Sequence, residues 1–546
     1  MAADSTRTAE PAAPGSAVAA GPKKLKLHGR AFYESLGSPK YIVAPMVDQS
    51  EFAWRMLSRS FHPESERASV LAYSPMFHAR QFIESQKYRD QHFQATRPGS
   101  TTPWLDGNPA FDRPLFVQFC ANDPDVLLAA ARIVAPHCDA VDLNLGCPQN
   151  IAKKGRYGSF LQEDQDLIHR MIRILHENLD VPVTAKIRIL DTPEATLAYA
   201  KNVLSAGASI LTVHGRRREQ KGHLTGLADW QMIRYLRDNL PPETVLFANG
   251  NILEHEDLER CLAATGADGV MSAEGNLSNP GLFAAPPPPG SEPRGYWRGR
   301  DGKGGWRVDE VFRRYLDILH EHPIEGLPAA NEKGKRTGKP TKRRSDVAKE
   351  CPDRLAPNFV GMQPHLFHLL RHLVGRHHDV RDALARTHLG EVEAYEAICR
   401  LVEKKVAEGL LEYERTGGKS VEEGGIDGPP PPPPAPASAV GAAAGEDEAD
   451  ADADAEGDRE SSARVVRECW RPWWVVQPVI RPLPKEALAR GAVQISKKDK
   501  KRMAAELEAE AEAEGGQDED KTKQRAKRAK EDGSAGDVAG GTLLPR

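Results

Sequence analysis

Residues 140–149, Ala-Val-Asp-Leu-Asn-Leu-Gly-Cys-Pro-Gln, join a short apolar run to a turn that contains a single cysteine. The run from Ala140 to Leu145 has the length and composition of a buried strand. Gly146 and Pro148 follow the run, and these two residue types favour a tight turn with a restricted backbone. We therefore expect Cys147 to lie in a turn directly after the carboxyl end of a strand.

The same unit recurs along the first half of the chain, where apolar runs alternate with amphipathic segments of helix length. The eight runs are residues 41–45, 70–74, 115–119, 140–145, 183–188, 209–213, 245–248 and 269–272. Eight such units within ~250 residues predict an α/β fold, the (β/α)8 TIM barrel. A doubly wound sheet is the competing fold, but no G-x-G-x-x-G follows the first run, as a dinucleotide-binding fold would need.

Polar or otherwise distinctive residues stand at the carboxyl end of most of these runs. They are Met46, Gln118, Asn144, Lys186, His214, Asn249 and Glu274. In a TIM barrel the carboxyl ends of the strands form one rim, and the active site is built there. Seven such residues on one rim predict a functional site rather than core packing.

The rest of the chain divides by composition into segments with different expected structure. We expect, in chain order, a disordered N-terminal segment at 1–28, a catalytic barrel at 29–285, a smaller helical domain at 306–413 that contains a basic insertion at 326–353, a proline-rich and acidic linker at 414–465, and a tryptophan-containing segment with a basic disordered tail at 466–546. The three tryptophans of residues 470–484 indicate that this stretch packs on a surface.

The arrangement of the cysteines and the hydropathy of the chain limit the cellular compartments in which the protein is expected. The seven cysteines are scattered singly without a C-x-x-C pair, which argues against a disulfide framework and against a zinc ribbon. Residues 1–22 lack the order of a signal peptide, and no stretch approaches the ~18 apolar residues of a membrane span. The net charge of −4 separates into an acidic block at 446–460 and basic blocks at 333–344 and 521–530. We expect a cytoplasmic or nuclear protein that does not bind membranes.

The residues of the expected rim indicate an anionic, hydrogen-bonding ligand. Lys186 and His214 each stand at a strand end, with Gln118 on the opposite side of the predicted barrel. Either basic residue alone could form a structural pair. Together they favour a ligand such as a flavin, which offers carbonyl and ring-nitrogen acceptors and a phosphate. The loops after the seventh and eighth runs occupy the usual phosphate position of this fold.

Cys147 itself allows two interpretations. A single cysteine after a strand is, taken alone, more often a small buried apolar residue. Its place on the rim, beside Asn144 and followed by the basic residues Lys153, Lys154 and Arg156, favours a functional role.

Three histidines, His365, His368 and His372, are spaced at i, i+3 and i+7 and are expected on one face of a helix. No cysteine or carboxylate lies in step with them, so a polar or RNA-facing stripe is favoured over a metal site. We therefore expect no metal.

With these motifs the chain resembles the tRNA-dihydrouridine synthases, from about residue 41 to 283 and more loosely through the helical domain. The segments that carry the resemblance are residues 44–54, 73–78, 115–119, 142–158, 185–188, 213–216 and 248–251. The first two of these segments and the Gly-Cys-Pro-Gln block look most like the eukaryotic branch of the family that modifies positions 16 and 17 of the D-loop. Arg217 departs from the threonine that usually follows His-Gly-Arg.

The resemblance implies an FMN cofactor, NADPH as reductant, and tRNA as substrate and partner. We expect the protein to be a monomer. It implies that uridine is reduced to 5,6-dihydrouridine, with hydride from reduced FMN to C6 and a proton from Cys147 to C5. The residues implied to contact FMN are Pro45, Met46, Val47, Gln118, Lys186, His214, Asn249, Gly250, Asn251, Ala273 and Glu274, and those implied to contact tRNA are Asn144, Lys153, Lys154, Arg156 and Arg216. A thiol is mostly protonated at neutral pH, so a cysteine can act as the acid.

Two other functions stay open at this stage. An FMN-dependent reductase of a free pyrimidine would share the fold and the cofactor, but it would not explain the basic loop beside Cys147. A catalytically inactive, tRNA-binding barrel is the second, although its expected sign, a replaced Cys147, Lys186 or His214, is absent.

Overall fold

The computed structural model describes residues 26–97, 99–322, 357–421, 462–484 and 486. The chain divides into two units, residues 1–481 and 482–546, and the second is described only at 482–484 and 486. The expected insertion at 326–353 lies outside the described residues. So do most of the expected N-terminal segment, linker and tail.

The described residues contain a closed parallel barrel, which confirms the predicted TIM-barrel fold. Its strands are β1 (Tyr41–Val43), β2 (Val70–Tyr73), β4 (Leu115–Cys120), β5 (Ala140–Leu145), β6 (Val183–Arg188), β7 (Ala208–His214), β8 (Val245–Asn249) and β9 (Gly269–Ser272). The barrel closes because β1 pairs with both β2 and β9, while β2 also pairs with β4. A short strand, β3 (Phe77–His78), extends the sheet beside the end of β4. Nearly every barrel-strand residue is buried, as expected for a sheet covered on both faces.

The register of the strands decides which polar side chains become neighbours. Gln118 lies opposite Asp142, and Asp142 lies opposite Thr184. One step further along, Asn144 lies opposite Lys186. At the strand ends, Arg188 pairs with His214 and His214 pairs with Asn249. Polar residues from five consecutive strands are thereby brought to the same end of the barrel.

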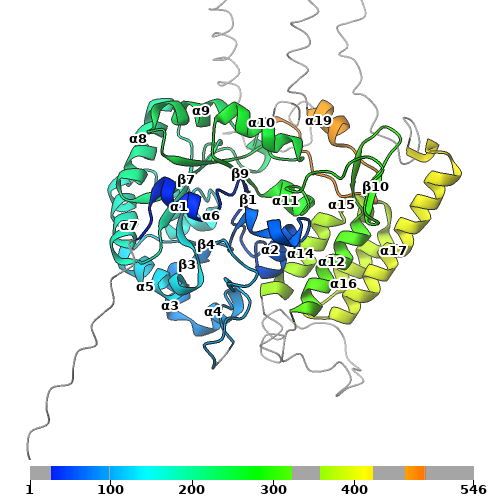
Figure 1. The fold of residues 1–546 in the computed structure, drawn as a ribbon, viewed down its shortest axis with the longest axis horizontal. Coiled ribbons are helices and arrows are strands. Elements are labelled where there is room, and N and C mark those ends of the chain that lie inside the picture. Colours follow the sequence, from blue (N-terminus) through cyan, green and yellow to red (C-terminus); the bar gives the residue numbers. More distant parts are fainter. Residues whose placement is uncertain (1–25, 98, 323–356, 422–461, 485, 487–546) are drawn as a thin grey trace, which may run out of the picture. The chain divides into compact units, whose positions relative to one another are not determined.

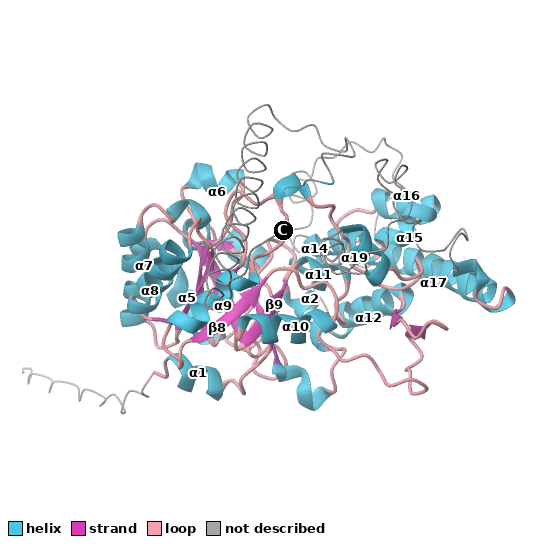
Figure 2. Cartoon of the chain, turned by 90° about the horizontal axis from the view of Figure 1, so that it is seen from above, coloured by secondary structure: helices cyan, strands magenta, loops and turns pink. Residues whose placement is uncertain are grey.

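Helices surround the strands (Figure 2). They are α2 (Phe52–Arg59), α3 (Ala79–Glu84), α4 (Gln86–His92), α5 (Pro124–Val134), α6 (Asn150–Gly155), α7 (Gln165–Asn178), α8 (Pro193–Ser205), α9 (Trp230–Asn239), α10 (Glu256–Thr265) and α11 (Glu274–Ser278). Several begin at strong caps: Asp123 and Thr192 accept backbone N–H bonds directly before a proline that opens the helix. The helix α1 (Gly29–Ser35) lies at the opposite end of the strands from α6 (Figure 2), and Tyr33 donates there to the carbonyl of Asp268.

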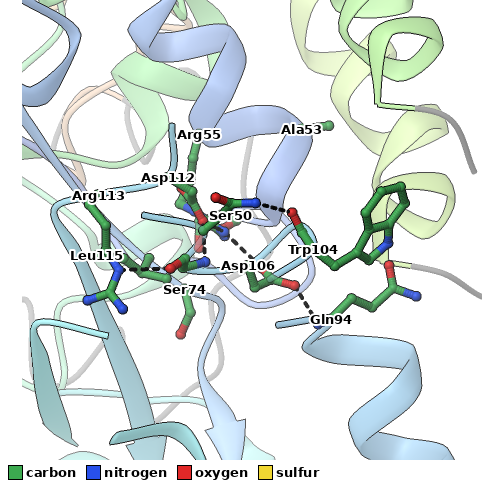
Figure 3. A network of polar contacts seen from close by, with 12 residues as sticks. Ser50, Ala53, Arg55, Ser74, Gln94, Trp104, Asp106, Asp112, Arg113 and Leu115 are labelled. Carbon is green, nitrogen blue, oxygen red and sulfur yellow. Dashed lines mark hydrogen bonds and ion pairs between the residues drawn. The ribbon is translucent and has the colours of Figure 1, made fainter. Parts of the chain in front are cut away.

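Four fully buried charges, which the sequence did not predict as a group, join α2 to the start of β4. We call Arg55, Arg59, Asp106 and Asp112 the arginine–aspartate network. Asp112 accepts from Arg59 at 2.8 Å. Asp112 also accepts from Arg55, and Asp106 accepts from both Arg55 and the backbone N–H of Gln94 (Figure 3). Arg59 also donates to the carbonyls of residues 70 and 114, next to the N-terminal ends of β2 and β4.

A helical region follows the barrel in α12 (Val308–Glu321), α14 (Pro357–Leu369), α15 (Arg371–Arg376), α16 (His378–Arg386) and α17 (Val392–Arg415). It contacts the barrel through α2 (Figure 1), where the side chain of Asn358 accepts from the N–H of Ala53 at 3.0 Å. No described helix is both long and apolar enough to cross a lipid bilayer.

The expectation that three histidines share one helical face is wrong. The helix is interrupted at Leu370, so His372 belongs to α15 whereas His365 belongs to α14. His365 is fully buried, lies 3.0 Å from both carboxylate oxygens of Glu51, and stacks on Trp54 with ring centroids 3.9 Å apart. Helix packing therefore uses this histidine, and the described residues contain no group of three or more metal-binding side chains.

The tryptophan-containing segment packs on a hairpin that the sequence did not predict. The hairpin consists of β10 (Tyr296–Arg298) and β11 (Gly304–Trp306), and the segment follows α19 (Ser462–Cys469). The N–H of Val476 donates to the carbonyl of Trp306, and Trp474 is fully buried against Trp297. We call residues 462–481 the strap. Helical structure, in α17 and α19, thus extends into both ends of the stretch expected to be a linker.

Candidate active site

The backbone around Cys147 wraps around the side chain of Asn144. The Asn144 Oδ1 atom accepts hydrogen bonds from the N–H of Gly146 at 3.2 Å and from the N–H of Cys147 at 2.9 Å. An asparagine that bonds the backbone two and three residues ahead stabilises a tight turn. Cys147 is half-buried. The predicted turn is present, and Asn144 holds it.

The basic loop after Cys147 supports the cysteine from a second side. The N–H and the hydroxyl of Ser159 both donate to the carbonyl of Cys147, at 3.1 and 2.9 Å. Gly158 has φ +66°, and a Cβ atom there would lie 2.8 Å from that same carbonyl oxygen. Only glycine fits this close approach. Lys153, Lys154 and Arg156, from α6 and its end, remain exposed beside it.

A chain of buried hydrogen bonds continues from Asn144 into the barrel. Asn144 donates to Gln118 at 2.8 Å, Gln118 donates to Asp142 at 2.8 Å, and Thr184 donates to Asp142 at 2.6 Å. Burial raises the pKa of Asp142 to about 6, while the bonds from Thr184 and Gln118 oppose that rise. Gln118 is fully buried with both ends of its amide engaged. The flavin contact predicted for Gln118 stays a prediction.

Sequence reasoning missed Asp142 and Thr184 as part of the site. A signal was present, because Asp142 and Asn144 are two residues apart on one strand and so point to the same side. A charged residue at an inward position of a buried strand needs a partner, and the partners come from β4 and β6.

Four basic side chains, Lys186, Arg188, His214 and Arg216, form what we call the cation cluster. Lys186 donates to the side chain of Asn249 at 2.9 Å, and Arg188 donates to the carbonyl of Gly146 at 2.7 Å. Arg216 donates to the ring of His214 at 3.1 Å. The sequence predicted three members but did not include Arg188, which the register places beside His214.

The cation cluster carries an excess of positive charge, although Asp142 acts to raise the pKa of Lys186 and Glu274 acts to raise the pKa of Arg216. Neighbouring residues form the ion pairs of this loop, Arg217 with Asp191 and Arg218 with Glu163, and no described ion pair involves the four cluster members. Burial, reinforced by the charge of Arg188, lowers the pKa of Lys186 to about 7. Burial and the charges of Arg188, Lys186 and Arg216 lower the pKa of His214 well below its ordinary value. Burial also lowers the pKa values of Arg188 and Arg216 to about 10 each, so both stay charged at neutral pH.

Glycines allow the loops after β7, β8 and β9 to pack closely against one another. Gly250 has φ +119°, and a Cβ atom there would lie 2.6 Å from the Cβ of Ala228. A Cβ atom on Gly275 would lie 2.2 Å from the carbonyl oxygen of Ile252. Asn251 joins this region to the cation cluster, because its side-chain oxygen accepts from Arg216 at 2.7 Å. The loops after β8 and β9 are those for which the sequence predicted a phosphate.

The remaining predicted residues lie in loops that follow the strand ends. After β1, Pro45 is half-buried and Met46 buried, whereas Val47 keeps 56% of its surface exposed. After β9, Ala273 is half-buried, and Glu274 is exposed and forms an ion pair with Arg481 of the strap. The structure therefore gathers the predicted residues at one end of the barrel, and their individual contacts with ligands stay predictions.

A parallel (β/α)8 barrel with a fixed cysteine and excess positive charge at the carboxyl ends of its strands defines a class of barrel enzymes that bind anionic ligands. Sequence comparison narrows this class: the profile of the family described as Dihydrouridine synthase (Dus) matches residues 42–292. The chain therefore belongs to the dihydrouridine synthase family and is an oxidoreductase, which confirms the resemblance.

Individual relatives agree with the family match. The chain is 49% identical to the tRNA-dihydrouridine(16/17) synthase [NAD(P)(+)] of Saccharomyces cerevisiae, over 70% of this chain and 78% of that protein. It is 44% identical to the protein of the same name from Schizosaccharomyces pombe, over 84% and 92%. A tRNA-dihydrouridine(16/17) synthase [NAD(P)(+)]-like protein of Rattus norvegicus is 41% identical, over 66% and 67%.

Proposed function

We propose that this protein reduces the C5–C6 double bond of uridine in the D-loop of tRNA, at positions 16 and 17, to 5,6-dihydrouridine. FMN is the cofactor and NADPH the reductant in this proposal. The observation that carries it is Cys147, half-buried and fixed through its own backbone N–H and carbonyl beside the cation cluster. The names of the relatives supply the substrate and its positions.

The residues at the barrel mouth fit a flavin mononucleotide. Lys186 is buried with three donor protons but, within the described residues, donates to Asn249 alone. An anionic or carbonyl-bearing ligand would use its remaining donors and offset the excess positive charge. Lys186 and His214 would hold the ring system against Met46, and the loops after β8 and β9, the usual phosphate position of this fold, would receive the phosphate. When bound and reduced, the flavin supplies the hydride for C6 of the uracil.

Cys147 supplies the proton in this proposal. Hydride arrival at C6 leaves an electron pair at C5, and the thiol proton is transferred to C5 to form the new C–H bond. The thiolate that remains takes a proton from solvent before the next turnover. Arg188 donates to the carbonyl of Gly146 next to Cys147, so it helps to fix the turn that carries the thiol.

The exposed basic side chains of the α6 loop suit the substrate. A uridine stacked within folded RNA cannot reach the barrel interior, so the base must leave its stack, which costs a few kcal/mol. Lys153, Lys154 and Arg156 are exposed beside Cys147 and can offset that cost through phosphate contacts. A reductase of a free pyrimidine would have no use for them.

The test is mass-spectrometric mapping of dihydrouridine in tRNA from cells that lack this protein and carry either wild type or Cys147→Ala. We expect wild type to restore positions 16 and 17 and Cys147→Ala to lower the purified enzyme's rate ~10²- to 10⁴-fold, the usual contribution of a general acid. Cys261→Ala, a buried cysteine of α10, is the matched control and should keep activity. Dihydrouridine that persists without the protein would contradict the proposal and favour the inactive RNA-binding alternative.

A further inference from the structure

The strap returns from the helical region to the mouth of the barrel. It is anchored to β11 and α12, where the carbonyl of Trp474 accepts from the N–H of Val308 at 2.9 Å. Arg471 fixes it further, with an ion pair of 3.2 Å to Glu254. A few residues after these anchors, Arg481 pairs with Glu274, the residue that directly follows the β9 loop. The two partners are 207 positions apart in the chain.

Arg481 adds positive charge where the barrel's own loop carries a negative one. Glu274 is exposed and stands at the end of the loop that we expect to receive a phosphate, so alone it would repel an anion. Its carboxylate is also near Arg216, because Glu274 raises the pKa of Arg216 while burial, the larger cause, and Arg481 lower it. One carboxylate therefore lies among two guanidinium groups, which leaves a net positive charge beside Asn251.

We propose that Arg481 is a phosphate-binding residue of the active site. The strap carries Arg481 to the site, and the ion pair with Glu274 holds its side chain in place. With Arg216, Arg481 binds the phosphate group received by the loops after β8 and β9. This inference rests on the proposed function for the phosphate's identity as that of FMN. The tRNA backbone is the other source of the same chemistry.

Arg481 can be removed without loss of the fold. It keeps 48% of its side chain exposed and Glu274 keeps 63%, and an exposed pair of this kind contributes at most ~1 kcal/mol to stability. The strap's own anchors, the buried Trp474 and the backbone bonds to β11, are unaffected by the change. A loss of phosphate affinity would therefore report on the guanidinium group alone.

The experiment uses the full-length apoprotein and compares its affinity for FMN and for riboflavin, which lacks the phosphate, by quenching of flavin fluorescence. We expect Arg481→Ala to weaken FMN binding about tenfold, as for loss of one charge-assisted hydrogen bond, and to leave riboflavin binding unchanged. Adding Glu274→Gln to that variant should restore part of the affinity, since it removes the repulsion. Arg173→Ala, from an exposed ion pair on α7, is the matched control and should change neither affinity.

A parallel measurement of tRNA binding separates the two phosphate sources. Weaker tRNA binding with unchanged FMN binding would assign Arg481 to the RNA backbone. Equal weakening of FMN and riboflavin, or no change in FMN and tRNA binding, would overturn the inference. If the wild-type protein binds FMN more tightly than riboflavin, FMN remains the proposed cofactor, whatever the result for Arg481→Ala. A wild type that does not discriminate between them would count against the proposed function instead.

Discussion

Two clusters of buried charge lie in this protein, and they are built in opposite ways. In the arginine–aspartate network each guanidinium has a carboxylate partner, and Asp112 alone pairs with both Arg55 and Arg59. Burial alone would raise the pKa of Asp112, but the two guanidiniums outweigh it and hold the pKa below its ordinary value. In the cation cluster the partners are carbonyls, amides and an imidazole, and burial lowers the pKa values of its members, as it also does for Arg59 of the network.

The difference separates a structural role from a binding role. Burying a charge is costly unless it is paired, so a fully paired cluster can exist for the fold alone. An unpaired cluster of like charges lowers stability and is retained where it acts on a ligand. We therefore expect removal of one charged partner from the arginine–aspartate network to lower the stability of the protein strongly. A reduction of positive charge in the cation cluster should instead raise the stability.

The largest expected effect is the loss of Asp112. Asp112→Ala leaves Arg55 and Arg59 buried without that carboxylate, and we expect it to lower the free energy of unfolding by ~3–5 kcal/mol. Urea denaturation of wild type and variant measures the change. A loss below about 1 kcal/mol would show that the network is not the structural cluster described.

An intermediate effect is expected for Asn144, whose neutral hydrogen bonds fix the turn that carries Cys147 at the mouth of the barrel. Asn144→Ala removes the acceptor for the N–H groups of Gly146 and Cys147, at ~1–3 kcal/mol for unsatisfied buried donors. We expect faster hydrogen exchange at Gly146 and Cys147 and a lower kcat. Asn144→Asp, which keeps an acceptor oxygen, should slow that exchange again. Unchanged exchange in Asn144→Ala would remove the positioning role.

A pH-dependent effect of similar size is expected from Lys186. The unfolded chain keeps this proton up to pH about 10.5, whereas the folded chain loses it near 7. Between these values the unfolded state binds more protons, so the stability of the apoprotein should rise with pH, by at most ~1.4 kcal/mol per pH unit. Lys186→Met should remove that rise between pH 7 and 9 in denaturation series. Parallel pH curves for the two proteins would contradict the assigned pKa.

The smallest effect is expected on the surface. Arg173 and Glu177 form an ion pair of 2.8 Å along α7 with 62% and 51% of their side chains exposed. Glu177→Ala should change the free energy of unfolding by less than ~0.5 kcal/mol, and added salt should reduce the change further. A result as large as that of Asp112→Ala would mean that burial does not explain the contrast between the charge clusters.

Local pattern was enough to predict the barrel strands. The expected runs 183–188 and 269–272 coincide with β6 and β9, and 209–213 differs from β7 by one residue at each end. Continuous apolar runs bounded by polar residues identify strands that are buried on both faces. The hairpin of β10 and β11 escaped prediction, because each strand has only three residues and the strands pack on the strap, a segment far away in the sequence.

The sequence by itself determined the fold class, the turn that carries Cys147, and the end of the barrel at which the site lies. Each of these depends on residues that are close together in the chain. Only the tertiary structure decided that Asn144 holds the cysteine turn, that Arg188 joins the cation cluster, and that Arg481 meets Glu274. These contacts depend on strand register and on the return of a distant segment. Both are set by packing over the whole chain, which no local pattern records.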